Sequence, residues 1–234
     1  MDLFQAKQSL HRHKNQLKAK VLSSFFKAGP GQYAEGDIFI GVAVPQIRRI
    51  AVQYQKLPLN QVKKLLKSQI HEERLLALII LTLKYAKVDK KGQNQIFDFY
   101  LTHIDRVNNW DLVDLTAPKI IGAYLNNRNR SILYQLAKSK NLWQRRIAIV
   151  STFCFIRNND FRDTLKLAAI LINDEEDLIH KACGWMLREV GKRNLAVEER
   201  FLKKYSSTMP RTMLRYAIER FPEKKRKHYL KNLL

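Results

Sequence analysis

The stretch that decides the fold is Leu75–Leu83, which reads LLALIILTL. Its apolar residues recur at the spacing of a helix that is buried on most of its surface. Nine residues are too few to cross a membrane, which takes about twenty, so we expect a core helix of a soluble protein. No convincing pair of alternating strands is found, and Gly (8) and Pro (6) are too scarce for an all-β fold. The sequence therefore predicts an all-α protein.

Similar helices begin again at nearly regular intervals of roughly 32 to 37 residues along the chain. A short polar side chain that can cap a helix precedes many of the apolar segments, as at Asp89, Asn141, Asp174 and Thr208. A small residue recurs within the repeats, where it lets a neighbouring helix approach closely. This period is typical of an α-solenoid of HEAT or armadillo helix pairs with a concave face. The predicted starts lie near Glu72, Asn109, Asn141, Asp174 and Thr208, and the small residues are Ala77, Ala117, Ala148, Ala182 and Ala217.

We predict a single domain over residues 1–234, with a helical cap and a Gly-rich loop in residues 1–44 and helical repeats in 45–234. The loop region 25–45 carries four of the eight glycines. It is expected to be a packed connector, although an aromatic loop beside a concave face can also touch a ligand. Pro45 fits the first turn of the first repeat helix.

The chain is strongly basic, with 43 Lys and Arg against 21 Asp and Glu, a formal charge of +22 and a pI near 10.1. Such a domain usually binds a polyanion, nucleic acid first and an anionic membrane surface second. The excess is spread along the chain, which favours a long basic surface over a basic tail. A generic basic protein is the plainer alternative.

The cysteines and the N-terminus predict a cytoplasmic protein without a metal. Cys154 and Cys183 lie in apolar helical segments and are interpreted as reduced thiols. No CxxC motif or Cys/His cluster is present, so no metal and no cofactor are expected. The N-terminus lacks the apolar segment of a signal peptide, so we expect the protein in the cytoplasm, with nucleoid DNA if the source is bacterial. The protein is expected to be a monomer.

The segment NNWDLVDLTAP, residues 108–118, combines an indole ring with two carboxylates at the start of a helix. Trp110 and Asp114 are four residues apart and share one helix face. Asp111 points elsewhere and is interpreted as a first-turn acid that favours the helix dipole. Pro118 lacks an N–H, so the carbonyl of Asp114 loses its usual partner and a kink is expected there. The plain alternative is a helix with an N-terminal acid and a core tryptophan.

The following repeats contribute cations and a second indole. Residues 141–150 (NLWQRRIAIV) contain Arg145 and Arg146, and residues 180–192 (HKACGWMLREVGK) contain Lys181, Trp185 and Arg188. Equivalent helices of a stacked solenoid stand about 10 Å apart, so these side chains can line one concavity with Trp110 and Asp114. A carboxylate between two indoles repels phosphate, and it suits a group that carries positive charge.

These three segments, and GPGQYAEGDIFIGVAVPQIRRIA before them, resemble the DNA alkylation repair glycosylases of the AlkD type over about residues 20–225. The resemblance implies HEAT-like-repeat enzymes that hydrolyse the N-glycosidic bond of 3-methyladenine and 7-methylguanine in duplex DNA without base flipping. It implies that Asp114 is the catalytic carboxylate, that Trp110 and Trp185 are the two indoles, that Arg146 is the arginine of the trough and that Arg188 contacts phosphate.

Arg145 and Lys181 are further candidates for contacts with DNA in this resemblance. The sequence departs from many members at Ala43, where they carry a basic residue, and this departure weakens one expected backbone contact. No lysine stands out as a nucleophile for strand cleavage, so the expected enzyme is monofunctional. Two alternatives remain: a non-catalytic paralogue that binds nucleic acid, and a protein-binding scaffold.

Overall fold

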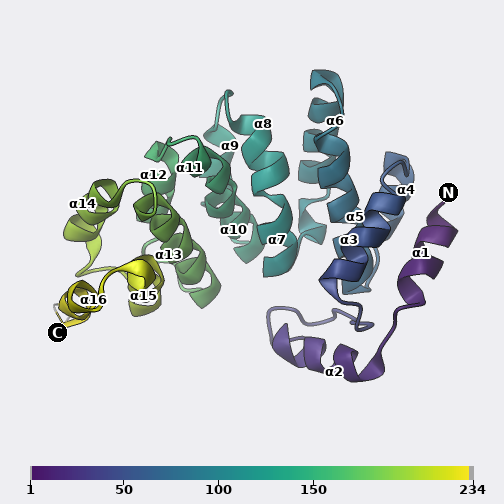
Figure 1. The fold of residues 1–234 in the computed structure, drawn as a ribbon, viewed down its shortest axis with the longest axis horizontal. Helices are drawn as coiled ribbons and strands as arrows, with labels where there is room; N and C mark the ends of the chain where they lie inside the picture. The colour runs from purple at the N-terminus through teal and green to yellow at the C-terminus, as the bar shows by residue number, and fades with distance from the viewer. Residues whose placement is uncertain (1, 232–234) are drawn as a thin grey trace. The chain divides into compact units, whose positions relative to one another are not determined.

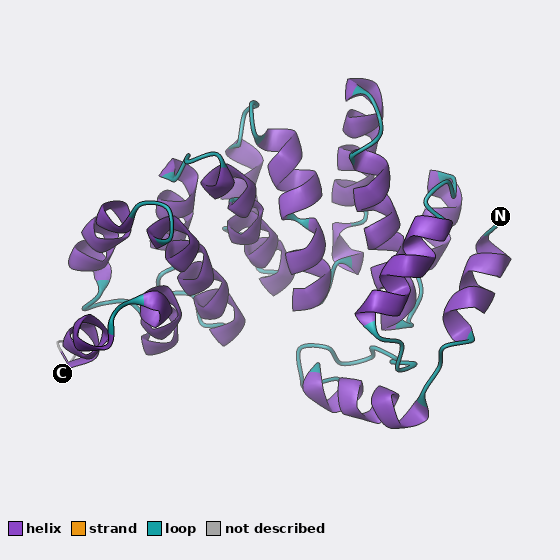
Figure 2. Cartoon of the chain, in the orientation of Figure 1, coloured by secondary structure: helices purple, strands orange, loops and turns teal. Residues whose placement is uncertain are grey.

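Helices make up the regular structure of the protein in the computed structural model, which describes residues 2–231 (Figures 1 and 2). Within that range no strand is formed, and the only extended pairing is an isolated bridge between Ile38 and Ile70. The all-α prediction is confirmed, and successive helices pack on one another as in an α-solenoid. The concave basic face stays a prediction.

The chain divides into two compact units, Met1–Thr116 and Ala117–Leu234. The boundary falls inside the segment 108–118, between the helix that carries Trp110 and the proline that follows it. One continuous domain over residues 1–234 stays a prediction.

The first unit is built around α5, a helix of 15 residues that packs against α3, α4, α6 and α7. The cap predicted at the N-terminus is present as α1 and α2, and α1 packs on α3 and α4. The elements are α1 (Leu3–His11), α2 (Gln16–Phe25), α3 (Val44–Gln53), α4 (Leu59–Leu66), α5 (His71–Tyr85), α6 (Lys90–Thr102), the 3-10 turn Ile104–Arg106 and α7 (Trp110–Thr116).

The second unit is built around α13, also of 15 residues, which packs against α10, α12, α14 and α15. It begins with a π-helical turn, Pro118–Gly122, that packs against α10 and α11. The helices are α8 (Ala123–Leu125), α9 (Ser131–Leu136), α10 (Leu142–Ser151), α11 (Phe153–Arg157), α12 (Arg162–Ile170), α13 (Asp177–Gly191), α14 (Leu195–Tyr205), α15 (Arg211–Ala217) and α16 (Glu223–Lys231), with a 3-10 turn at Ile218–Arg220.

The predicted helix starts agree with the structure to within a few residues, and two predicted caps are confirmed. Asn141 accepts from the N–H groups of the first turn of α10, and Asp89 accepts from the N–H of Gly92 in α6. Asp174 and Thr208 lie three residues before α13 and α15, so they cap neither helix. Pro45 stands in the first turn of α3, as predicted.

At Pro118 the helix changes type, while the backbone of Ala117, Gly122 and Ala123 stays in the helical region. The last residue of α7 is Thr116, and the chain then forms the wider π turn in which the N–H of Gly122 donates to the carbonyl of Ala117 at 2.9 Å. Proline has no N–H to offer the preceding turn, and a π turn is a common place for a helix to bend. The kink at Asp114 itself stays a prediction.

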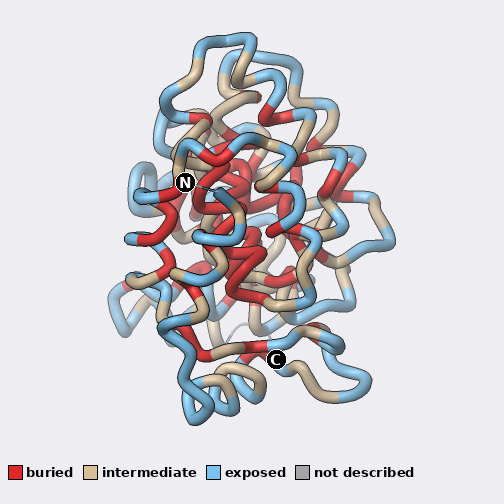
Figure 3. The backbone as a smooth tube through the Cα atoms, turned by 90° about the vertical axis from the view of Figure 1, so that its right-hand side faces the viewer, coloured by how far each residue is buried: buried red, intermediate tan, exposed pale blue. Residues whose placement is uncertain are grey.

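The core follows the apolar periodicity of the sequence. Every residue from His71 to Leu81 in α5 is buried, and the turns between helices are mostly exposed (Figure 3). The five recurring alanines are all fully buried, as expected for residues at which helices approach closely: Ala77, Ala117, Ala148, Ala182 and Ala217.

The closest such approach next to a candidate residue is at Gly184, beside Trp185 in α13. A Cβ at this position would fall well inside van der Waals contact of the Met213 carbonyl oxygen and the Tyr216 side chain, both on α15. The absence of a side chain therefore sets the distance between α13 and α15.

Gly184→Ala is expected to lower the free energy of unfolding by about 1–3 kcal/mol, because a backbone carbonyl cannot move aside. Alanine is the better helix former by about 1 kcal/mol, so a net loss measured by urea denaturation shows that the clash dominates. Gly29→Ala is the control, since its Cβ would meet only the flexible Gln32 side chain. A Gly184→Ala protein as stable as wild type would contradict the close packing of α13 against α15 at this position.

Candidate functional site

Trp110, the first residue of α7, is held in an aromatic stack and stays partly exposed. The backbone N–H of Trp110 donates to Oδ1 of Asn109 at 2.8 Å, which fixes the helix start. The indole stacks on Phe26 with ring centres 5.0 Å apart, and Phe25 meets it edge-on at 5.8 Å. Phe25 is itself 61% exposed. The ring is therefore held by Phe26 and Phe25 and stays partly exposed.

His71, at the start of α5, connects this stack to α7. The imidazole packs against Phe26 and Phe39, at 5.1 and 4.7 Å between ring centres, and these two rings stack on each other at 5.2 Å. Its Nε2 donates to Oδ2 of Asp111 at 2.8 Å, and its Nδ1 donates to Oδ2 of Asp37 at 3.2 Å. A carboxylate only accepts hydrogen bonds, so a proton on each ring nitrogen satisfies both contacts. His71 is therefore best described as an imidazolium.

Asp111 is a first-turn acid of α7, as predicted. It has a second role that the sequence did not indicate, because it is 8% exposed and bonds to His71. Its other oxygen accepts from the N–H of Leu112 at 2.8 Å. The sequence could not reveal this role, because the partner lies 40 residues earlier in the chain.

The charges around His71 shift its pKa upward. Burial alone would lower the pKa of the imidazole, but the carboxylates of Asp111 and Asp37 outweigh burial and the charge of Arg74, and the pKa rises to about 9. Burial likewise opposes the ionisation of Asp37, but His71 and Arg74 lower the pKa of that carboxyl below its ordinary value. The cluster is a buried ion-pair network in which each charge supports the next.

Glu72 fixes the Gly-rich loop to the same helix. Its carboxylate accepts from the N–H groups of Ile40, Gly41 and Val42, at 3.1, 2.8 and 3.3 Å. Gly41 has a φ of +81°, and a Cβ there would collide with the carbonyl of Asn15. Glycine is therefore required for the loop to reach the carboxylate.

Glu73 fixes α1 to α5. It is 1% exposed and pairs with Nζ of Lys7 at 2.8 Å and with Nε2 of His11 at 2.7 Å. Burial opposes its ionisation, but bonds from Lys7, Ser68 and His11 lower the pKa of this carboxyl below its ordinary value. The N-terminal cap is thus joined to the core helix by ionic contacts.

Asp114 lies one turn after Trp110 on α7 and is half-buried. Burial raises the pKa of the Tyr100 phenol against the opposing bond to Thr116, and the negative charge of Asp114 adds to the increase. That phenol is within hydrogen-bond distance of Oγ1 of Thr116, at 3.0 Å. Asp114 is thus positioned by a helix whose inner face is well packed.

In the second unit, Arg145 has internal partners. It makes bonds of 2.6 and 3.0 Å to the two carboxylate oxygens of Asp174, and it donates to the carbonyls of Ser139 and Lys140 at 3.0 Å each. Arg74 of α5 makes the same set of bonds, to one aspartate and to the backbone carbonyls five and six residues before it. The recurrence gives Arg145 a structural role at a repeat start. Its predicted contact with DNA stays untested.

Arg146, Trp185 and Arg188 also bond within the second unit. Arg146 is 5% exposed and donates to the carbonyl of Leu178, close to the start of α13. Trp185 is half-buried, and its Nε1 donates to Glu189 at 3.2 Å. The Arg188 guanidinium pairs with Glu219.

Lys181 is the most accessible of the predicted cations. It pairs with Asp177 at 2.7 Å on α13, and its side chain is 38% exposed. The structure therefore places Trp110 and Asp114 on one helix of the first unit. The other five candidates lie on α10 and α13, which pack together in the second unit. That all seven meet at one ligand stays a prediction.

A family model described as DNA alkylation repair enzyme matches residues 6–221 of the chain. The chain belongs to this family. A search of curated proteins finds no match.

Among solved structures, a protein from Enterococcus faecalis described as a predicted DNA alkylation repair enzyme matches with a TM-score of 0.69 at 18% identity. The match covers 90% of this chain and 98% of that one. At this identity the likeness supports the fold, and the family model supports membership.

None of the helices within residues 2–231 of this repair enzyme has the length and apolar character needed to cross a membrane. In the same residues, no group of three or more His, Cys, Asp and Glu is arranged to hold a metal ion. Cys154 is half-buried and Cys183 is buried, and both are free thiols.

His71 and the pair Phe25 and Phe26 are the residues of this site that the sequence interpretation missed. Two signals were available. Four ionisable residues, His71–Arg74, stand directly before the most apolar segment of the chain, where solvent exposure is least expected. Two adjacent aromatic residues end the predicted N-terminal cap, where a solvated turn would usually be polar.

The His71 cluster predicts a pH-dependent stability. A base whose pKa is raised from 6.5 to about 9 stabilises the fold below pH 6.5, and the contribution is lost as the pH rises toward 9. As the pH rises from 6 to 9, the free energy of unfolding of wild type should fall by up to about 3 kcal/mol more than that of His71→Asn. Urea denaturation over this pH range measures the difference.

His13→Asn, at an exposed histidine, is the control and should keep the wild-type profile. Glu198, whose pKa burial raises to about 8, titrates in the same range. It is present in all three proteins, so it cancels in the comparison. Parallel profiles for wild type and His71→Asn would show that His71 carries no buried charge.

Proposed function

We propose that this repair enzyme is a monofunctional DNA glycosylase that hydrolyses the N-glycosidic bond of cationic alkylpurines, 3-methyladenine and 7-methylguanine, in duplex DNA without base flipping. The observation that carries the proposal is the pairing of Trp110 and Asp114. A fixed, partly exposed indole stands one helical turn from a carboxylate, in a chain with a formal charge of +22. Membership of a DNA alkylation repair family supports DNA as the substrate.

The proposed role of Asp114 is electrostatic. A purine alkylated at N3 or N7 is already a cation, so it leaves readily and needs little help from a general acid. Positive charge develops on the sugar in the transition state, as in other glycosyl hydrolysis. A carboxylate that faces this charge stabilises it and orients the attacking water.

The two indoles are proposed to bind the cationic nucleotide through the faces of their rings. Such cation–π contacts are worth about 0.5–2 kcal/mol each, more where water is excluded. Trp110 is fixed by Phe26, and Trp185 is oriented by the bond from its Nε1 to Glu189. Rings that are already fixed lose little conformational entropy when the ligand binds.

The cations divide by their accessibility. Lys181 has the most exposed side chain of the four and is the best placed to meet a phosphate from solvent. Arg188 contacts phosphate in the proposal if it exchanges its pairing with Glu219 for one with DNA. Arg145 and Arg146 bond to other residues of the protein, and they are proposed to hold the helices of this surface in place.

Asp114→Asn should slow base release on the order of 10²-fold, or about 3 kcal/mol, because the amide keeps the shape and removes the charge. The measurement is single-turnover release of 7-methylguanine from methylated duplex DNA. Undamaged DNA should bind as well or more tightly, since a negative charge has been removed from a surface that faces phosphate.

Asp98→Asn, at an exposed position on α6, is the matched control and should retain the wild-type rate. Asp111→Asn does not serve for this purpose, because its carboxylate bonds to His71. Equal rates for wild type and Asp114→Asn would remove Asp114 from the mechanism and favour a non-catalytic, DNA-binding member of the family.

Trp185→Phe should retain more activity than Trp185→Ala if the ring meets a cation, because the phenyl face keeps part of the indole quadrupole. Base-release rates are compared with the melting temperature of each variant. Rates that merely follow the loss of folded protein would assign Trp185 to the core, beside Phe153 at 5.7 Å between ring centres.

A further inference from the structure

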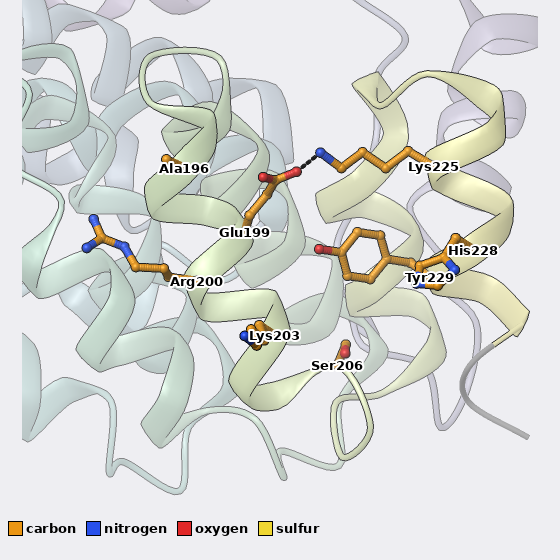
Figure 4. Close-up of a pocket in the computed structure, with 8 residues that line it drawn as sticks. All are labelled: Ala196, Glu199, Arg200, Lys203, Ser206, Lys225, His228 and Tyr229. Carbon is orange, nitrogen blue, oxygen red and sulfur yellow. Dashed lines mark ion pairs between the residues drawn. The ribbon is translucent and has the colours of Figure 1, made fainter.

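The second unit contains an open pocket of about 550 Å³ between α14 and α16 (Figure 4). Arg200 and Lys203 reach it from α14, and Lys225, His228 and Tyr229 reach it from α16. The residues are three or four apart on each helix, so each set shares one face. Two facing helix surfaces therefore supply the walls, and none of these residues belongs to the site proposed for catalysis.

The pocket is cationic because its acid is already paired. Lys225 forms an ion pair with Glu199, drawn as a dashed line in Figure 4. Arg200 and Lys203 are exposed, and no acid among the described residues pairs with either of them. Two uncompensated positive charges therefore remain at the pocket.

The carboxyl beneath the pocket adds little negative charge. Glu198, on α14, is 1% exposed, and burial raises its pKa to about 8 against the opposing effects of Arg188 and Lys225. At neutral pH this group is mostly protonated. The local potential is therefore more positive than the formal charges indicate.

The chemistry of the walls suits a phosphate attached to a nucleotide. Guanidinium and ammonium groups are the usual partners of phosphate oxygens. The Tyr229 ring lies between the two helices with its hydroxyl toward α14 (Figure 4), and an aromatic face offers a sugar or base a surface to pack on. A volume of 550 Å³ also exceeds what a single phosphate group fills.

The charge continues beyond the pocket, which favours a polymer. Together α14 and α16 carry eight Lys and Arg against three Glu. On α16, Arg226 and Lys227 share one acid, Glu223, at 3.7 and 3.6 Å. A ligand with one phosphate leaves most of these cations unused, whereas a strand presents phosphates in series.

We propose that the α14–α16 pocket binds the phosphodiester backbone of a nucleic acid strand, as a contact additional to the residues proposed for catalysis. The inference rests on the DNA binding of the proposed function and not on its chemistry. Arg200 and Lys203 bind phosphate oxygens, the pair of Glu199 and Lys225 closes one side, and Tyr229 packs against the adjoining nucleotide.

The test compares Arg200→Gln/Lys203→Gln with Lys90→Gln/Lys91→Gln, which removes the same two charges from exposed positions on α6. Binding of undamaged duplex DNA is measured by fluorescence anisotropy over a range of KCl concentrations. The pocket variant should bind about 10-fold more weakly near 0.1 M salt. The slope of log K against log salt should fall by close to two, at about 0.9 for each phosphate.

The control variant should change both quantities by less than half as much. Equal losses in the two variants would indicate a general effect of net charge and would overturn the pocket. Unchanged binding in the pocket variant would overturn it as well. Undamaged DNA is used, so a wild-type protein that releases no base contradicts the proposed function and leaves this test standing.

The identity of the ligand is tested by acylating lysines of wild type and locating the products by mass spectrometry. DNA should protect Lys203 from the reagent at least 5-fold more than inorganic phosphate at the same phosphate concentration. Equal protection by inorganic phosphate would identify a site for single anions. Protection by poly-glutamate and not by DNA would identify an acidic protein partner, and either result would refute the proposal.

Discussion

Everything that positions the candidate site in the first unit depends on the burial of four consecutive ionisable side chains, His71–Arg74, at the start of α5. Removing charges from water costs several kcal/mol each unless every one finds a partner of opposite charge or a set of hydrogen bonds. The partners come from separate segments: α1 for Glu73, the Gly-rich loop for Glu72, and Asp37 and Asp111 for His71. The cluster is satisfied only when cap, loop and α7 are in place together.

The bond between His71 and Asp111 fixes the rotation of α7 and thereby the direction of its candidate residues, Trp110 and Asp114. Successive helical residues are about 100° apart, so Trp110 and Asp114 lie within about 40° of each other. Asp111 lies about 100° from Trp110 and about 60° from Asp114, with both of them on the same side of it. With Asp111 pointing inward, Trp110 and Asp114 therefore lie to one side of the buried direction, where both stay partly exposed. Phe26 completes the arrangement, because it stacks on both the imidazole and the indole. Asp111, the acid beside the tryptophan, thus holds α7 in position through its bond to His71.

The sequence was sufficient for features that depend on neighbours along the chain. Helical periodicity and local hydrogen bonding account for the burial of Leu75–Leu81, the caps Asp89 and Asn141, the buried alanines and the shared face of Trp110 and Asp114. It was insufficient where a side chain is satisfied by a segment remote in the sequence. Asp111 fits the dipole of its own helix equally well with or without His71, and only the packing of α5 against α7 distinguishes the two cases. For the same reason, the sequence placed Phe26 in a connecting segment and did not reveal that it stacks on Trp110.

Arg145 shows how the same limit affects the interpretation of charge. In a chain with a charge of +22, an arginine at the start of a helix resembles a DNA contact. However, Arg145 and Arg74 each hold an aspartate and the two carbonyls of the preceding turn, in equivalent positions of two repeats. Part of the basic excess therefore joins one repeat to the next. Net charge overstates the charge available to a polyanion, and the informative cations are exposed ones without an acidic partner. By that criterion Arg200 and Lys203, which no sequence motif singled out, are stronger candidates for phosphate contacts than Arg145.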